Sequence, residues 1–549
     1  MLVSEAVGRT LAGLGTRHVF GLVGSGNFAV TSTLAAMGAT FVPARHEGGA
    51  VTMADAYARV SGEPGVCSVH QGPGLTNTMT GLTEAAKSRT PLLLLAADTA
   101  GAAVRSNFRI QQDQLVASVG AVPERLHSPE TAVADTVRAH RRARLERRPV
   151  VLMMPLDIQA ASCHDPGTAI PAPPVLRAVR PSAAAVTEAA RSLERAERPL
   201  ILAGRGAALA GARAPLERLG DTLGALLATS AVANGLFAGS PWELGISGGF
   251  ASPLSARLIG EADVVLAVGA TLNMWTTRHG RMVGPKATVI QVDHDGDAIG
   301  AHHRVDIAVV GDAAESALAL LDALPSPSPG SPRWRTSELA GQLERGSWRR
   351  QPYQDAGDGG LIDPRTLSIT LDTILPDERT VAVDSGHFMG WPCMYLRVPD
   401  SSGFVFTQAF QAVGLGLASA IGAAVARPDR LTVAALGDGG AMMSLADLET
   451  VGRLGLRMLV VVYDDAAYGA EVHHFGPHGH AVDVARFPDV DLAAIARGAG
   501  LRGHTVRQAG DLDAVSTWLE DGALPGLLLD AKVVPTVVGE WLEEAFRGH

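Results

Sequence analysis

Short runs of consecutive apolar residues alternate along this chain with segments whose apolar residues recur at helical spacing. The clearest runs are Leu92–Ala96, Val150–Met154, Asp263–Val268 and Leu431–Leu436. Runs of this length that end at glycine or polar residues are typical of strands buried on both faces. Strands that alternate with amphipathic helices predict parallel sheets built from βαβ units.

Two proline-rich stretches interrupt this alternation. One spans Cys163–Pro181, and the other spans Pro325–Pro332 and continues into a polar segment up to about Gly360. Proline-rich composition favours extended linkers. The chain is therefore predicted to be α/β, with three doubly wound parallel-sheet domains at residues 1–165, 182–325 and 345–549.

The most informative stretch follows the apolar run at 431–436. That predicted strand stops at Gly437-Asp438-Gly439, whose glycines permit a sharp turn and close approach of the backbone to a ligand. An amphipathic helix is predicted from about Ala441 to Arg453, with apolar residues at helical spacing. A second buried strand, 457–463, ends at Asp464-Asp465.

These two strand ends predict a metal site. The carboxyl ends of neighbouring parallel strands face one crevice, so we expect Asp438 and Asp465 to meet there. Two carboxylates with backbone carbonyls nearby form a hard oxygen site that suits Mg²⁺, which usually keeps part of its coordination shell for phosphate oxygens.

Composition excludes several classes of partner. The 549 residues carry a formal net charge of −10, which argues against nonspecific binding to nucleic acid or to an anionic membrane. The longest apolar run, Pro91–Ala97, is too short to span a bilayer. The three cysteines show no paired spacing, so we expect a reduced, cytoplasmic protein.

The sequence around the aspartates resembles a known cofactor motif. Gly437-Asp438-Gly439 is followed, 27 residues after its aspartate, by Asp465 in the pattern V-Y-[polar]-[polar]-x-x-Y-G. This resembles the thiamine-diphosphate motif of the acetolactate synthase and 2-oxo acid decarboxylase superfamily. The resemblance implies that Asp438, Asp465 and the backbone carbonyl of Ala467 bind the metal.

One departure from the family pattern adds charge at this site. The family usually carries Asn-Asn where this chain has Asp464-Asp465. An aspartate still offers an oxygen, but it places extra negative charge beside a diphosphate. We therefore expect weaker or more metal-dependent cofactor binding.

The N-terminal block resembles the pyrimidine-binding domain of the same superfamily. The resemblance rests on RHEGGAVTMADAYARVSG, which contains Glu47, and on SVHQGPGLTN, residues 68–77. Alone, Glu47 would be an ordinary carboxylate at a helix N-terminus. The resemblance implies that it hydrogen-bonds the pyrimidine ring, stabilising the imino tautomer that takes the proton from the thiazolium ring.

Four residues are candidates for choosing the reaction. Ser25 and His70 follow predicted strands and should point into the crevice. A histidine at the position of His70 resembles the benzoylformate decarboxylase branch of the superfamily. The alternative interpretation of His70 is an ordinary loop histidine. Arg109 and Gln111 lie in the segment SNFRIQQDQL, which corresponds to a glutamine-bearing loop of relatives. Arg109 suits carboxylate recognition, and the alternative is a surface arginine.

Further contacts to the cofactor are implied by the resemblance. A strand at 380–383 ends at residues expected near the diphosphate, and Val413 takes the place of a larger apolar wedge. The full cofactor-binding set is Glu47, Gly74, Asn77, Ser385, Gly386, His387, Val413, Gly437, Asp438, Gly439, Gly440, Asp465, Ala467, Tyr468 and Gly469. His473, His474, His478 and His480 are expected in a mobile loop over the active site, in preference to a metal site.

The central block is expected to be a smaller doubly wound domain, which in relatives binds FAD, ADP or nothing. Its Gly204-Arg205-Gly206 turn lacks the third small residue of a dinucleotide fingerprint. Residues 272–280 do not resemble the arginine pattern associated with FAD in acetolactate synthases. FAD is possible, but we do not favour it.

Together these features predict an enzyme that depends on thiamine diphosphate and Mg²⁺. It would cleave or decarboxylate a 2-oxo acid and either release an aldehyde or transfer the acyl anion to a second carbonyl. Alternatives are an acetolactate-synthase-like carboligase with a strict acceptor and a non-catalytic subunit of the same fold. The resemblance further implies a homodimer or homotetramer with active sites at subunit interfaces, acting on a small 2-oxo acid or aldehyde.

Overall fold

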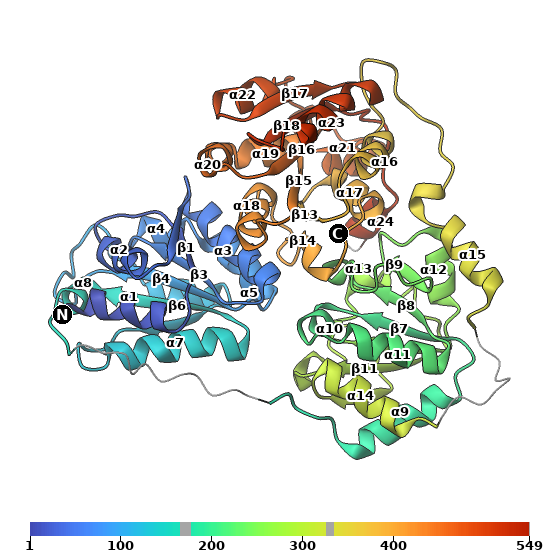
Figure 1. The fold of residues 1–549 in the computed structure, drawn as a ribbon, viewed down its shortest axis with the longest axis horizontal. Coiled ribbons are helices and arrows are strands. Elements are labelled where there is room, and N and C mark those ends of the chain that lie inside the picture. Colours follow the sequence, from blue (N-terminus) through green and yellow to red (C-terminus); the bar gives the residue numbers. More distant parts are fainter. Residues whose placement is uncertain (165–176, 326–333, 548–549) are drawn as a thin grey trace.

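The computed structural model describes residues 1–164, 177–325 and 334–547. Within these ranges the chain forms three six-stranded sheets whose strands pair in parallel, which confirms the predicted α/β class (Figure 1). The central parts of the two proline-rich stretches predicted as extended linkers, residues 165–176 and 326–333, lie outside the described residues.

The first sheet has the order β2-β1-β3-β4-β6-β5. Its strands are β1 (His18–Gly21), β2 (Thr40–Pro43), β3 (Gly65–Val69), β4 (Leu92–Asp98), β5 (Val122–Arg125) and β6 (Pro149–Pro155). The helices between and beside them are α1 (Val3–Gly13), α2 (Phe28–Ala36), α3 (Glu47–Ser61), α4 (Pro73–Thr76), α5 (Met79–Lys87), α6 (Gln112–Ser118), α7 (Ala132–Glu146) and α8 (Leu156–Gln159).

The central sheet has the order β12-β11-β10-β7-β8-β9. Its strands are β7 (Pro199–Ala203), β8 (Leu226–Thr229), β9 (Glu243–Ile246), β10 (Val264–Val268), β11 (Thr288–Asp293) and β12 (Ile307–Val310). Its helices are α9 (Ala183–Glu194), α10 (Arg205–Leu209), α11 (Arg213–Leu223), α12 (Pro253–Gly260), α13 (Met274–Thr277) and α14 (Ala313–Ala323).

The third sheet has the order β14-β13-β15-β16-β18-β17. Its strands are β13 (Arg379–Val383), β14 (Phe404–Phe406), β15 (Leu431–Gly437), β16 (Met458–Asp464), β17 (Arg502–Val506) and β18 (Leu527–Lys532). Its helices are α16 (Pro364–Ile374), α17 (Gly390–Tyr395), α18 (Gly416–Ala426), α19 (Asp438–Met443), α20 (Asp447–Leu454), α21 (Gly469–Phe475), α22 (Leu492–Gly498), α23 (Asp513–Glu520) and α24 (Trp541–Phe546).

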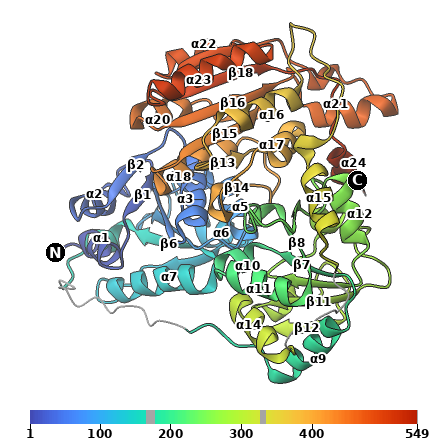
Figure 2. The ribbon, with the colours of Figure 1, turned by 45° about the vertical axis from the view of Figure 1, so that its right-hand side comes forward.

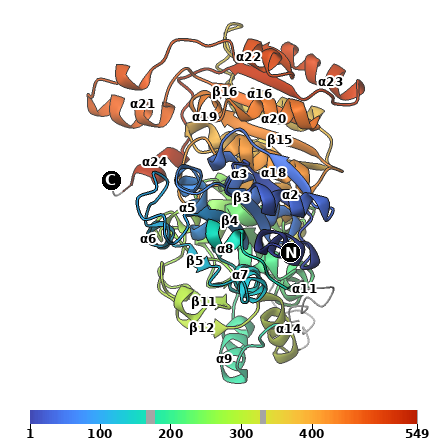
Figure 3. The ribbon, with the colours of Figure 1, turned by 90° about the vertical axis from the view of Figure 1, so that its left-hand side faces the viewer.

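The first and third domains pack through α3 and α18, which lie side by side in all three views (Figures 1, 2 and 3). Gly422 on α18 lets the two helices approach, since a Cβ there would lie 2.1 Å from the carbonyl oxygen of Met53. At the edge of this contact the backbone N–H of Arg45 donates to Asp447 of α20. Glu47, the first residue of α3, therefore lies beside α20 of its own chain.

Two predictions about helices were wrong. The helix expected over 441–453 is two helices, α19 and α20, because the chain turns at Ser444, whose hydroxyl donates back to the carbonyl of Gly440. The polar segment after the second proline-rich stretch is not wholly extended: it contains α15 (Ser337–Arg345). Thr336 caps this helix, which buries Leu339 and Leu343 on one face.

Candidate active site

A cavity of about 340 Å³ opens at the carboxyl ends of the third sheet. Predicted residues from three neighbouring strand ends line it, because β13, β15 and β16 stop in register: Val383 lies opposite Ala435, and Gly437 opposite Tyr463. The predicted residues in its wall are Ser385, Gly386, His387, Val413, Gly437, Asp438, Gly439, Gly440, Asp465, Ala467, Tyr468 and Gly469.

The two aspartates predicted to bind metal interact electrostatically across this cavity. Burial and repulsion from Asp465 raise the pKa of Asp438 to about 8, and burial with repulsion from Asp464 raises that of Asp465 to about 6. A divalent cation between the carboxylates would replace this repulsion with attraction. Ala467, whose backbone carbonyl is the third predicted ligand, lines the same cavity as the two carboxylates. Oxygen donors of this kind fit Mg²⁺.

Asp384 shapes the same cavity, although it was not singled out as a site residue. Its buried carboxylate accepts backbone N–H groups from Ser385, Gly414 and Leu415, while burial raises its pKa to about 6. This one side chain therefore ties the loop after β13 to the loop that carries Val413. Its position directly after a buried strand was the signal available in the sequence.

Other lining residues were missed. Trp275 comes from the central domain, Gln408 and Gln411 from the loop before α18, and Trp541 and Phe546 from α24. None has a motif of its own in the sequence. Only the tertiary packing of segments distant in sequence brings these residues to the cavity.

Glu471 was also missed, and it is the cavity-lining carboxylate not assigned to the cofactor or metal. It lies in the first turn of α21, three residues after Tyr468, and its backbone N–H donates to the carbonyl of Tyr468. One helical turn places both residues on the same side. That spacing after the Y-G motif could have identified it.

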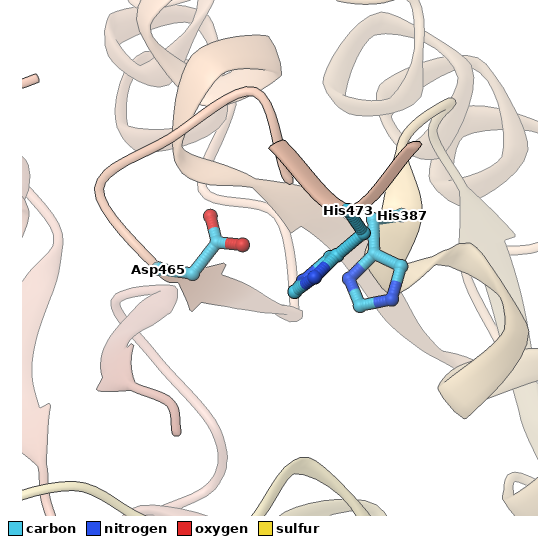
Figure 4. A group of neighbouring side chains, drawn as sticks. All are labelled: His387, Asp465 and His473. Carbon is cyan, nitrogen blue, oxygen red and sulfur yellow. The ribbon is translucent and has the colours of Figure 1, made fainter. Parts of the chain in front are cut away.

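His387, Asp465 and His473 converge beside the cavity (Figure 4), with potential ligand atoms all within 4.8 Å of one another. Burial and the neighbouring His473 lower the pKa of His387 to about 3, so its ring is neutral. Its Nε2 already accepts the backbone N–H of Gly539, and Arg486 faces both His473 and Asp465. We assign no separate metal to this group.

The expected loop over the active site begins as a helix. His473 and His474 belong to α21, and the ring of His474 stacks on Phe546 with centroids 3.9 Å apart. The Nδ1–H of His478 donates to the backbone carbonyl of His474 at 2.6 Å. The histidine-rich segment is thus joined to the C-terminal helix α24.

The first domain brings its own predicted residues together. The Asn77 amide donates to Oε2 of Glu47 at 2.9 Å, and a Cβ on Gly74 would lie 3.7 Å from Oε1 of the same carboxylate. Glu47, Gly74 and Asn77 thus form one cluster at the N-terminus of α3.

Ser25 and His70 lie in direct contact, with Ser25 Oγ 3.3 Å from His70 Nε2. His70 Nδ1 lies 3.0 Å from the carbonyl oxygen of Gln71, so the hydrogen-bond pattern assigns the proton to Nδ1. Nε2 is then left as the acceptor for the serine hydroxyl. Phe108 packs edge-on against the imidazole, with ring centroids 5.0 Å apart.

The predicted Arg109 and Gln111 are exposed on the loop before α6. The neighbouring glutamine is the buried one: Gln112 accepts the N–H of Gly72 and donates to the carbonyl of Ala97. Gln112 therefore fixes the turn after β3 on which His70 stands.

The two halves of the predicted site lie apart within one chain. The described residues that line the 340 Å³ cavity come from Trp275 and from positions 364–546, and none belongs to residues 1–164. The Glu47 cluster instead lies at the contact with α20. Among the described residues, the predicted metal ligands and the predicted pyrimidine-binding residues therefore do not line one cavity within a single chain.

Comparisons with known proteins match all three domains. Residues 1–117 match the model described as the N-terminal TPP binding domain of thiamine pyrophosphate enzymes, residues 186–321 the central domain, and residues 384–523 the C-terminal TPP binding domain. The chain belongs to the thiamine pyrophosphate enzymes. The two binding domains are the first and third domains described above, so the cofactor is thiamine diphosphate.

Relatives of this thiamine pyrophosphate enzyme have several named activities. A probable 2-ketoarginine decarboxylase from Pseudomonas aeruginosa is 31% identical over 95% of this chain and 92% of its own. The sulfoacetaldehyde acetyltransferase of Castellaniella defragrans is 28% identical over 93% and 89%. A solved thiamine-diphosphate-dependent 4-hydroxybenzoylformate decarboxylase from Rhodococcus jostii RHA1 shares the fold, with a TM-score of 0.83, 22% identity, and coverage of 98% of this chain and 100% of its own.

A second cavity, of about 460 Å³, lies between the central domain and its neighbours in this thiamine pyrophosphate enzyme. Arg205 lines it and donates to the carbonyl of Ser88 in the first domain, and burial lowers its pKa to about 9. The preference against a flavin stays a prediction. Within residues 1–164, 177–325 and 334–547, every helix is too short or too polar to span a bilayer.

Proposed function

We propose that this enzyme decarboxylates a 2-oxo acid and releases the corresponding aldehyde, using thiamine diphosphate and Mg²⁺ at an active site shared by two subunits. The observation that carries the proposal is the Ser25–His70 pair at the strand ends of the pyrimidine-binding domain. When bound, thiamine diphosphate supplies the electron sink for decarboxylation.

The residues of the third domain would hold the diphosphate end of the cofactor. Asp438, Asp465 and the Ala467 carbonyl would ligate Mg²⁺, while the glycines of the 437–440 turn allow close approach of the phosphates. Val413 would support the cofactor from its position in the cavity wall. In the first domain, Glu47 would bind the pyrimidine ring, with Asn77 orienting its carboxylate.

His70 would provide the proton that completes aldehyde formation. Its Nδ1–H donates to the Gln71 carbonyl, so Nε2 can receive a proton through Ser25 and deliver it to the reacting carbon. Phe108 and Gln112 hold this group in place through the imidazole ring and the turn after β3.

A second subunit would complete the site, as a homodimer or homotetramer. The described lining of the metal-side cavity contains no residue of the first domain, so Glu47, Ser25 and His70 of a partner would have to face it. Closed two-fold symmetry would then generate two equivalent sites for each dimer.

Transfer of the acyl group to a second carbonyl is the other candidate, favoured by the likeness to the Castellaniella acetyltransferase. The cavity wall argues for a different substrate from that relative's. Its described lining contains no lysine or arginine, so the wall of this cavity offers a sulfonate no arginine or lysine partner. An acceptor would have to be recognised mainly by neutral and aromatic side chains.

The test is product analysis with a panel of 2-oxo acids, with and without an added aldehyde acceptor. His70→Ala should slow aldehyde release by about 10² to 10⁴, the usual contribution of a positioned acid, while carbon–carbon bond formation falls less. Arg105→Ala, which alters an exposed side chain with no assigned role in the loop before α6, is the control. Equal loss of both products, or an unchanged product ratio, would return His70 to the role of a loop histidine and favour the carboligase.

A further inference from the structure

The chain has only three lysines, Lys87, Lys286 and Lys532, among 46 basic residues. Lys532 is the last residue of β18 and is buried, with 5% of its surface exposed. Lysine is rarely buried without a charged partner. Neighbouring groups must therefore stabilise the positive charge of the buried Lys532 ammonium.

Three carboxylates surround the Lys532 ammonium. Nζ lies 2.6 Å from Asp464, 2.5 Å from Asp489 and 3.1 Å from Asp530, and it also donates to the carbonyl of Val490. Although burial opposes the charged form, the hydrogen bonds to Asp464 and Asp489 raise the pKa of Lys532 above its usual value. Lys532 thus joins the end of β16 to the segment that enters α22.

Asp464 connects this ammonium to the metal-binding turn. One carboxylate oxygen accepts the Lys532 hydrogen bond, and the other accepts the backbone N–H of Ala466 at 2.9 Å. Ala466 has a positive φ of 52°, a conformation that a residue with a side chain adopts only when its surroundings hold it there. The turn that carries Asp465 and Ala467 is therefore fixed from the Asp464 side.

The same turn is held on its other side by backbone hydrogen bonds. The Phe487 N–H donates to the carbonyl of Ala466, and the Tyr468 N–H donates to the carbonyl of Ala485. Asp489 and Val490, which bind Lys532, lie two and three residues after Phe487 in the sequence. Lys532 therefore contacts both segments that fix the turn.

Asp464 also bears on the charge at the metal site, since its negative charge repels both Asp438 and Asp465. An uncompensated third carboxylate would add to this repulsion beside a diphosphate. The ammonium of Lys532, 2.6 Å from the Asp464 carboxylate, offsets the negative charge of that carboxylate. This explains how the chain accommodates Asp464 where the family pattern has a neutral asparagine.

We propose that Lys532 is a positioning residue for the magnesium site, acting through Asp464 to hold the 464–468 turn and to offset its extra charge. The proposal rests on the proposed function, because it takes Asp465 and the Ala467 carbonyl as the metal ligands. Lys532 is not itself among the residues that line the cavity.

The experiment is calorimetric titration of Mg²⁺ into the full-length apoenzyme with saturating thiamine diphosphate. Lys532→Met keeps the length of the side chain and removes the charge. We expect it to weaken Mg²⁺ binding by at least about tenfold, the size associated with loss of one charge-assisted hydrogen bond. Adding Asp464→Asn should restore much of that loss, because a neutral amide needs no counter-charge.

Asp489→Asn is the matched control. Asp489 also binds Lys532, but its side chain is exposed and lies outside the turn, so this variant should bind Mg²⁺ within about twofold of the parent. Full Mg²⁺ affinity in Lys532→Met, or a double variant no better than Lys532→Met, would overturn the proposal. A thermal melt of each apoenzyme separates a general loss of stability from a loss of metal affinity in folded protein.

Asp465→Ala separates this proposal from the proposed metal site. If Asp465→Ala binds Mg²⁺ normally, the site itself is elsewhere; if it fails to bind while Lys532→Met binds normally, only the role of Lys532 is wrong. Should Lys532→Met not fold, Asp464→Leu and Asp464→Asn carry the test. Asparagine can still accept the Ala466 N–H through its one side-chain oxygen and should preserve most of the affinity, whereas leucine accepts no hydrogen bond and should lose at least about tenfold. Equal affinities of the two variants would refute the proposal.

Discussion

The two halves of the proposed active site are built differently within one chain. In the third domain, residues from the ends of β13, β15 and β16 line a single cavity, and two of their carboxylates repel each other across it. In the first domain, Glu47 and Asn77 pair with each other, as do Ser25 and His70, without entering that cavity. The predicted metal ligands of the third domain therefore lie together within one chain, whereas the predicted groups of the first domain do not line that cavity.

The difference shows which part of the function a single chain can complete. A metal site formed at adjacent ends of one parallel sheet needs only local register, since β15 and β16 place Asp438 and Asp465 together. The proposed proton-transfer groups, Ser25 and His70, would depend on how the surface of a second subunit approaches them. Changes in the third domain should therefore act on cofactor affinity, and changes in the first domain on turnover.

The largest effect is expected for Asp465→Ala. Removing one of the two facing carboxylates should abolish Mg²⁺-dependent binding of thiamine diphosphate, because the cation would keep only one carboxylate from the protein. Asp464→Ala should weaken binding less, since that side chain acts through the turn. Calorimetry on both variants checks this, and intact binding in both would place the metal elsewhere.

The next effect is expected for Glu47→Gln. It should retain the fold and cofactor binding yet lose activity by about 10² to 10⁴, because glutamine cannot share a proton with the pyrimidine nitrogen. Glu5→Gln, which changes another glutamate in the first turn of a helix, is the control. Turnover within a few-fold of the parent enzyme would contradict the role assigned to Glu47.

The smallest effect is expected for Val413→Leu. The side chain lines the cavity and is 38% exposed, so one more methylene can be buried against the cofactor. Burial of one methylene contributes about 0.8 kcal/mol, or roughly a fourfold gain in affinity for thiamine diphosphate. Unchanged binding would contradict a contact between Val413 and the cofactor.

Most of the fold was predictable because buried parallel strands appear as continuous apolar runs, as in Leu92–Ala96 and Leu431–Leu436. The helix break at Ser444 was not, because it depends on a side-chain hydrogen bond to Gly440 and on Asp447 reaching Arg45 in another domain. α15 was missed because polar residues cover all but one narrow apolar stripe of two leucines.

The metal side was predictable for a similar reason. Asp438 and Asp465 directly follow apolar strands, so the sequence itself places them at one sheet edge. Glu471, Trp275 and α24 come from helices and another domain, and no local pattern marks their arrival at the cavity. Lys532 lies 67 residues from Asp465 in sequence, and only the pairing of β16 with β18 brings it beside Asp464.

We propose that each active site combines the first domain of one chain with the third domain of another. The most direct test mixes Glu47→Gln and Asp465→Ala enzymes after mild dissociation and measures aldehyde release. Each variant alone should be nearly inactive, and statistical exchange of a two-fold dimer should recover about a quarter of the parental activity, since half of the dimers carry one intact site. No recovery, despite proven subunit exchange, would mean that both halves act within one chain.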